Sequence, residues 1–73
     1  MNLTARKLDI LTRVCNGEKT FAIACDLHIT ESAVERHIED LHKMADAHCR
    51  VDLVRWAINE GHLEVEKWLL HER

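Results

Sequence analysis

The chain contains no proline and no tyrosine, and its only glycines are Gly17 and Gly61. A sequence with so few helix breakers favours helices, and the two glycines mark points where helices can end. The aromatic residues are Phe21, Trp56 and Trp68, which are too few for a β-sandwich or for a sheet that stacks on bases. These absences favour an all-α fold.

Long apolar runs are also missing. None approaches the roughly 20 residues that cross a bilayer, and Arg6, Lys7 and Asp9 interrupt the segment where a signal peptide needs an apolar core. The chain has 73 residues, of which 47% are hydrophobic and 32% charged. That composition is typical of one small globular domain near the lower size limit for a self-sufficient core. We expect a cytoplasmic protein.

Cysteine and histidine lack the spacing that chemistry requires. Cys15, Cys25 and Cys49 are odd in number and have no paired spacing, which argues against a disulfide framework. Each falls on or near an apolar stripe, so we expect each to act as a small hydrophobe. The six histidines form no i,i+4 pair and accompany no Cys-x-x-Cys. We expect no metal, no cofactor and no enzymatic activity.

Apolar residues at helical spacing predict the first two helices. Thr4 is a suitable N-cap for the first helix, and Gly17 provides a left-handed stop at its C-terminus. The second helix is expected from about Lys19 to Leu27. The residues that it should bury are Phe21, Ile23, Ala24 and Leu27.

The third helix is expected over residues 31–45, after a tight connection in which Thr30 is the N-cap. Val34, Ile38 and Leu41 should be buried. His37 lies on the same stripe and is expected to be a core-edge histidine, hydrogen-bonded within the bundle. The opposite face carries Glu31, Ser32, Glu35, Arg36, Glu39 and Lys43, of which Glu35 and Glu39 are expected to be exposed.

A fourth helix is expected from about Arg50 to Asn59, ending at Gly61. A short additional helix over residues 63–70 would place Trp68 on its apolar face. We therefore divide the chain into a domain of residues 1–63 and a helical extension of residues 64–73. Two tryptophans so near the C-terminus suggest more apolar surface than a small monomer can bury, and favour dimerisation or a partner contact.

The second and third predicted helices form a helix-turn-helix pattern, with the exposed face of the second member free to enter the major groove of DNA. The full string of residues is more specific. It resembles the LuxR/GerE-type domain over residues 3 to 63. The matching positions are Leu3, Thr4, Arg6, Ile10, Leu11, Gly17, Ile23, Ala24, Leu27, Ile29, Thr30, Val34, His37, Arg50, Leu53, Val54, Ala57 and Gly61.

This resemblance implies four helices, of which the third contacts DNA bases and the fourth often forms a two-fold dimer contact. The DNA contacts that it implies are Lys19, Thr20, Thr30, Ser32, Glu35, Arg36, Glu39, Lys43 and Arg50. The candidate dimer interface consists of Val54, Trp56, Ala57, Ile58 and Trp68. Arg36 matches a position at which the family contacts bases.

The chain departs from the family where DNA would lie. Glu35 stands where a lysine is usual, and Glu39 where a basic or neutral polar residue is frequent. Asp46 ends a Met-Ala-Asp run in place of the usual lysine-leucine-glycine. Residues 31–43 carry four acidic and two basic groups, and the whole chain has a net charge of −3. A dedicated nucleic-acid binder usually has the opposite sign.

Two functions therefore remain open. One is a transcription regulator that binds double-stranded DNA as a homodimer through the third helix. The other is a non-enzymatic interaction protein on the same fold, whose acidic third helix or C-terminal apolar surface binds and inhibits another protein. The family resemblance favours DNA, whereas the charge distribution favours a protein partner.

Overall fold

The computed structural model describes residues 3–63, and these hold four α-helices and no strand. The helices are α1 (Ala5–Cys15), α2 (Thr20–Leu27), α3 (Glu31–Ala45) and α4 (Arg50–Asn59). The all-α prediction is confirmed, as are the predicted limits of the third and fourth helices. The second helix begins at Thr20, one residue later than expected, with Lys19 as its N-cap. The additional helix and the extension with Trp68 fall on residues 64–73, outside the described part.

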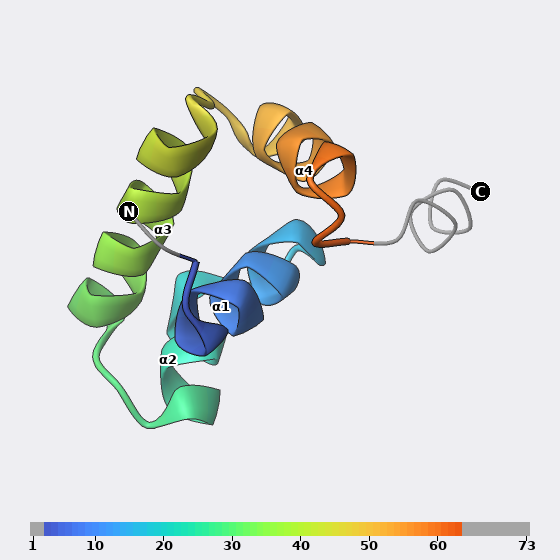
Figure 1. The fold of residues 1–73 in the computed structure, drawn as a ribbon. Helices are drawn as coiled ribbons and strands as arrows, with labels where there is room; N and C mark the ends of the chain where they lie inside the picture. The colour runs from blue at the N-terminus through green and yellow to red at the C-terminus, as the bar shows by residue number, and fades with distance from the viewer. Residues whose placement is uncertain (1–2, 64–73) are drawn as a thin grey trace.

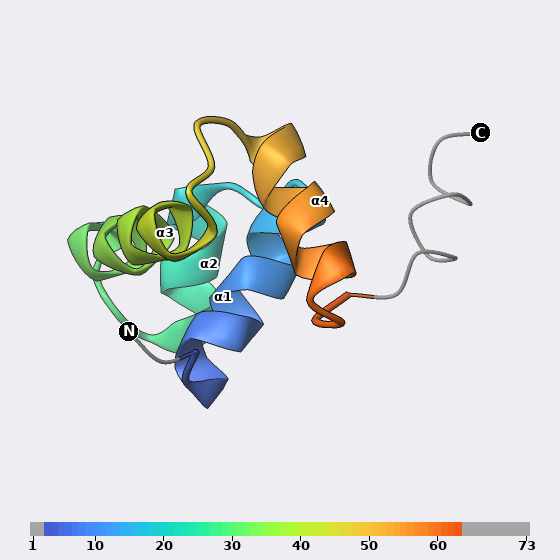
Figure 2. The same ribbon diagram turned by 45° about the horizontal axis from the view of Figure 1, so that its top comes forward.

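The four helices form one bundle in which α3 and α4 lie on opposite sides (Figure 1). α1 and α2 pack beside each other and against α3, and α1 also packs against α4 (Figures 1 and 2). The arrangement leaves one long side of α3 facing solvent.

Every helix contributes to one apolar core. Its largest fully buried side chains are Ile10, Leu11, Ile23, Val34, Leu41 and Leu53. Burial of each side chain contributes about 1.5–3 kcal/mol relative to exposure. The predicted burial of Val34 and Leu41 is confirmed, whereas Ile38 is only half-buried and packs against the edge of the core.

Two predicted N-caps are confirmed. The Thr4 hydroxyl accepts a hydrogen bond from the Lys7 amide at 3.2 Å, and the Thr30 hydroxyl accepts one from the Ala33 amide at 3.1 Å. Each satisfies an amide at a helix start that has no partner within the helix, which is worth about 1 kcal/mol. Thr30 thereby fixes where α3 begins.

The turns between helices use backbone conformations with positive φ. Gly17 follows α1 with φ +88°, which confirms its predicted role. His28 ends α2 with φ 57° and Asp46 ends α3 with φ 53°, both in the left-handed region. A side chain with a Cβ is disfavoured there, although aspartate tolerates it better than most. The glycine usual in the LuxR/GerE type at the position of Asp46 suits this geometry.

Three expectations about buried side chains were wrong. Phe21 is 66% exposed, and Cys25 and Cys49 are exposed free thiols. For Phe21 and Cys25 the reason is helical geometry. Ile23 and Ala24 face the core, and at about 100° per residue Phe21 and Cys25 then project from the opposite side of α2. Cys15 alone behaves as expected, since it is buried in the core. This burial raises the pKa of the thiol to about 11.

Replacing Asp46 tests the strain in the turn after α3. We expect Asp46→Gly to raise the free energy of unfolding by about 0.5 kcal/mol, because relief of the left-handed strain outweighs the entropy that glycine adds to the unfolded chain. The matched change in the opposite direction, Gly17→Ala, should lower it by about 1–2 kcal/mol. Urea denaturation at one protein concentration measures both. A destabilised Asp46→Gly variant would contradict this interpretation.

Candidate nucleic-acid interface

The turn between α2 and α3 holds the two helices as a rigid pair. His28 adopts the left-handed conformation, and the amide of Ile29 donates a hydrogen bond to the carbonyl oxygen of Ala24 at 3.1 Å. Ile29 packs against the core. These contacts end α2 and direct the chain into α3, as in a helix-turn-helix.

We define the α3 outer face by its six exposed residues, which span about 140° of the helix surface at roughly 100° per residue. They are Glu31, Ser32, Glu35, Arg36, Glu39 and Lys43. The predicted exposure of Glu35 and Glu39 is confirmed. None of the six is apolar, so this face adds nothing to the core and is available for contacts.

Charges on the α3 outer face are separated into two edges. Glu31, Glu35 and Glu39 follow one another at four-residue intervals along one edge, where like charges destabilise the helix by about 0.2–0.5 kcal/mol per pair. Arg36 and Lys43 lie along the other edge. The Lys43 ammonium is 4.0 Å from the Glu39 carboxylate, a pair exposed enough to contribute little.

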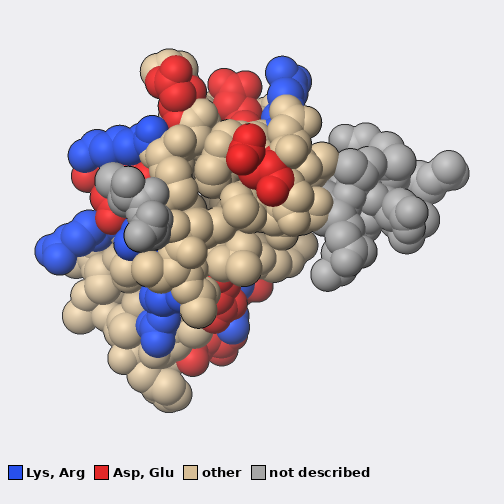
Figure 3. Space-filling model, in the orientation of Figure 1, with Lys and Arg blue, Asp and Glu red and all other residues tan. Residues whose placement is uncertain are grey.

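The cationic edge continues onto α1. The Lys7 ammonium lies 3.7 Å from the Asp40 carboxylate and joins the N-terminal turn of α1 to α3. Arg6 precedes Lys7 in the first turn of α1, and the charges of both, with that of Arg36, contribute to the lowered pKa of His37. Figure 3 shows basic side chains gathered on the α3 side of the molecule. Arg6 and Lys7 were not predicted to belong to this surface. The one signal in the sequence was Lys7 itself, since the LuxR/GerE type often has a glutamate at that position.

The remaining predicted DNA contacts lie at helix ends. Lys19 and Arg50 are exposed, and an Arg50 Nη1 atom lies 3.6 Å from the position that a Cβ on Gly17 would occupy. Arg50 is therefore beside the loop that contains Lys19. Thr20 is half-buried, and the hydroxyl of Thr30 already caps α3. The structure thus provides two separate cationic areas.

The exposed surface of α4 differs from the predicted interface, which included Trp56 and Ala57. Ala57 is fully buried and takes no part in the exposed surface. The α4 outer face consists instead of Val51, Val54, Arg55 and Ile58, within about 100° of the helix surface. Val51 is 63% exposed, and Val54 and Ile58 are half-buried. Val51 was not predicted, although its spacing to Val54 and Ile58 places it on the same stripe.

The comparison with known families confirms the resemblance. The family described as GerE, bacterial regulatory proteins of the luxR family, matches residues 1–57. The chain belongs to the luxR family. No curated protein and no solved structure matches it. As a luxR-family member, the chain has its exposed Glu35 and Glu39 on the helix that contacts DNA bases in the family.

The Trp56 ring is half-buried against the core and lies 5.2 Å from the His62 ring, so part of it already has a partner within the chain.

Among residues 3–63 no group of three histidine, cysteine or acidic side chains is placed to hold a metal ion. No described helix is both long enough and apolar enough to span a membrane.

His37 does not make the hydrogen bond that we expected. Its Nδ1 atom is buried and has no hydrogen-bond partner among the described residues. The neighbouring Lys7 ammonium is directed to Asp40 instead. Burial, followed by the positive charges of Lys7, Arg6 and Arg36, lowers the pKa of His37, and Asp40 offsets only part of this.

The lowered pKa predicts a pH dependence of stability. Between the unfolded pKa of about 6.5 and the lower folded value, the unfolded chain binds more protons at residue 37. The free energy of unfolding should therefore fall as the pH drops from 7.5 through 6.5. His37→Gln, which cannot titrate, should lose part of this fall in urea denaturation at pH 7.5, 6.5 and 5.5. His48→Gln, at an exposed position, is the control. An unchanged pH profile for His37→Gln would show that His37 is not responsible.

Proposed function

We propose that this luxR-family chain is a transcription regulator that binds double-stranded DNA as a homodimer, with α3 in the major groove. The observation that carries the proposal is the α3 outer face, which is polar and exposed from Glu31 to Lys43 on a helix held by a helix-turn-helix pair. The major groove admits one α-helix, and polar side chains on that helix recognise base edges. Family membership supports the same function.

The separated charges determine how such a helix would sit. Arg36, at the edge shared with Arg6 and Lys7, is the best placed residue for a base or phosphate contact, and no described residue forms an ion pair with it. Glu35 and Glu39 repel phosphate, but a glutamate can accept a hydrogen bond from the N4 amino group of cytosine. We therefore propose base-specific contacts from Arg36 and the carboxylate edge, and phosphate contacts from the other cations of the cationic edge. Non-specific affinity should be low.

A second area of positive charge supports the same orientation. Arg50, at the start of α4, lies beside Gly17 in the loop between α1 and α2, and the exposed Lys19 follows in the same loop. In helix-turn-helix complexes the elements beside the recognition helix contact the sugar-phosphate backbone and fix its orientation. We assign Lys19 and Arg50 this backbone role.

The dimer in this proposal forms through the α4 outer face. Val51 is exposed, and Val54 and Ile58 are half-buried, so the described residues leave this apolar stripe partly uncovered. Two-fold association through one such helix brings a stripe against its own copy, which is the commonest arrangement of small homodimers. It would also present two α3 helices to paired half-sites.

Charge changes on α3 test DNA binding. Arg36→Ala should weaken binding of a specific duplex by about 1–3 kcal/mol, the value of a bidentate base contact. Glu35→Lys should strengthen binding of random duplex and steepen its logarithmic salt dependence by about one per protomer, because one more cation releases one more counterion. Fluorescence polarisation against labelled duplexes at several salt concentrations measures both.

The matched control for these variants is Glu60→Lys, which makes the same charge change as Glu35→Lys at the exposed C-cap of α4 rather than on α3. It should leave the direct contacts of α3 with DNA intact. Equal affinities of wild type and Arg36→Ala for a specific duplex would remove α3 from the interface.

Substitution of Val51 tests the dimer. Val51→Glu should convert the protein to a monomer at micromolar concentration, because two carboxylates would meet across the two-fold axis without partners. The fold should persist, since Val51 is largely exposed in the monomer. Sedimentation velocity measures the change. Phe21→Asp, on α2, is the control and should leave the dimer unchanged. A wild-type monomer at high concentration would contradict the dimer.

One observation favours a different function. Three carboxylates at four-residue intervals on α3 are better suited to a basic protein than to phosphate. In this second proposal α3 binds and inhibits a basic protein. The wild-type chain would then have no measurable duplex affinity at low salt, and Glu35→Lys with Glu39→Lys would abolish the protein association. The C-terminal apolar surface considered for the same role falls on residues outside the described part.

A further inference from the structure

The outward side of α2 is apolar. Four exposed residues, Phe21, Ala22, Cys25 and Asp26, cover about 140° of this helix, and we call them the α2 outer face. Asp26 is the one charged residue in the helix. Apart from Asp26, the helix has apolar residues on its outward side as well as on its inward side, yet only the side with Ile23 and Ala24 is buried. The α2 outer face is therefore suited to a contact that none of the described residues makes.

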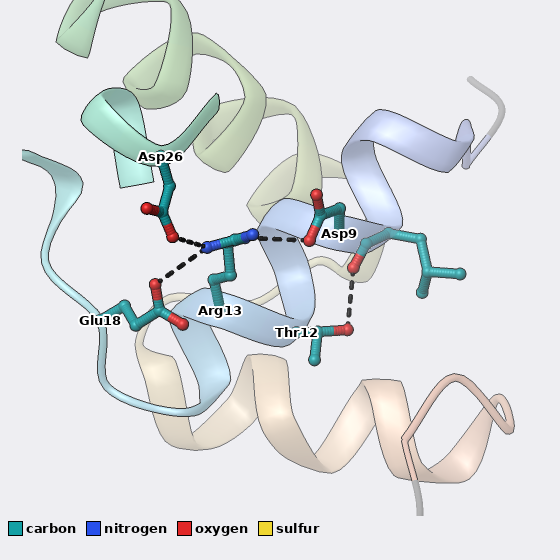
Figure 4. A network of polar contacts seen from close by, with 6 residues as sticks. Asp9, Thr12, Arg13, Glu18 and Asp26 are labelled. Atoms are coloured by element: carbon teal, nitrogen blue, oxygen red, sulfur yellow. Dashed lines mark hydrogen bonds and ion pairs between the residues drawn. The ribbon is translucent and has the colours of Figure 1, made fainter. Parts of the chain in front are cut away.

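An acidic cluster borders this face. The Arg13 guanidinium lies 2.6 Å from Asp26, 3.0 Å from Asp9 and 3.3 Å from Glu18 (Figure 4). We call these four residues the Arg13 cluster. One cation against three carboxylates leaves a charge of −2. Arg13 is the least exposed of the four, whereas the side chain of Asp26 is 65% exposed, so the charge that solvent meets is negative.

The negative charge of the Arg13 cluster indicates what kind of molecule could bind the α2 outer face. A second copy of the chain on this face would bring two such clusters together, and nucleic acid or an anionic membrane would likewise be repelled. A helix with leucine-like residues on one side and lysine or arginine on the other complements both the apolar residues and the carboxylates. We propose that the α2 outer face, with the Arg13 cluster, binds a basic amphipathic helix of another protein.

This surface is separate from the proposed DNA contacts. None of its residues belongs to the α3 outer face, and neither Lys19 nor Arg50 is among them. The side chain of Phe21 would be the central apolar anchor, since it is large, rigid and 66% exposed. Asp26 would accept hydrogen bonds from the cations of the partner at the border of the face.

The test uses a synthetic helical peptide composed of leucine and lysine, with leucine at i, i+3, i+4 and i+7. Titrated into the ¹⁵N-labelled full chain, it should produce saturable NMR shifts centred on Phe21, Ala22 and Cys25. Phe21→Asp and Asp26→Asn should each weaken binding, the former by about tenfold or more, because it places a carboxylate where the apolar anchor was. Phe21 is exposed, so the variant should keep the wild-type fold, which its own spectrum checks.

Two controls separate this surface from the others. Glu35→Gln removes a carboxylate from α3 and should leave the peptide affinity unchanged. A peptide with glutamate in place of lysine should not bind. The proposal is overturned by an absence of saturable shifts, by shifts centred on α3, or by equal binding of the two peptides. It is also overturned if Phe21 shifts with protein concentration alone, which would identify a second copy as the occupant. Failure of DNA binding would leave these results unaffected.

Discussion

Everything in this structure depends on four short helices sharing one core. Ile10 and Leu11 of α1, Ile23 of α2, Val34 and Leu41 of α3 and Leu53 of α4 are all fully buried. Because the chain is small, each helix can supply only one narrow stripe to that core. The opposite sides of α2, α3 and α4 are consequently left to solvent. Each outer face then has its own composition: apolar on α2, charged on α3, and aliphatic with one arginine on α4.

The helices and their limits could be predicted because the local signals agreed with the core. Thr4 and Thr30 are N-caps, and the hydroxyl of each accepts a hydrogen bond from an amide in the first turn of the helix that follows. Gly17 suits a left-handed conformation that few residues adopt. Val34 and Leu41 lie seven residues apart, which returns to the same side of a helix. These features are local, so sequence alone is sufficient to identify them.

Burial of individual residues was harder to predict. Phe21 was expected inside because it is large and apolar, but α2 has apolar residues on both its inward and its outward side, so periodicity could not identify which side faces the core. His37 lies on the predicted stripe, but its buried Nδ1 atom meets no hydrogen-bond partner among the described residues, whereas Lys7 of α1 pairs with Asp40. Pairing of that kind depends on the tertiary arrangement. The cationic area formed by Arg6, Lys7 and Arg36 was not predicted for the same reason. The candidate DNA and dimer contacts remain predictions, with Ala57 removed because it is buried.

Family membership and charge lead to different expectations for α3, and the separation of its charges into two edges reconciles them. A helix with carboxylates on one edge and Arg36 on the other can bind DNA only with a few phosphate contacts. The affinity of the wild-type chain for random double-stranded DNA, measured against salt concentration, tests this account most directly. We expect measurable binding at low salt that weakens as salt rises. The slope of the logarithm of the affinity against the logarithm of salt concentration should correspond to a few phosphates per protomer. An absence of binding at the lowest salt concentration would contradict it.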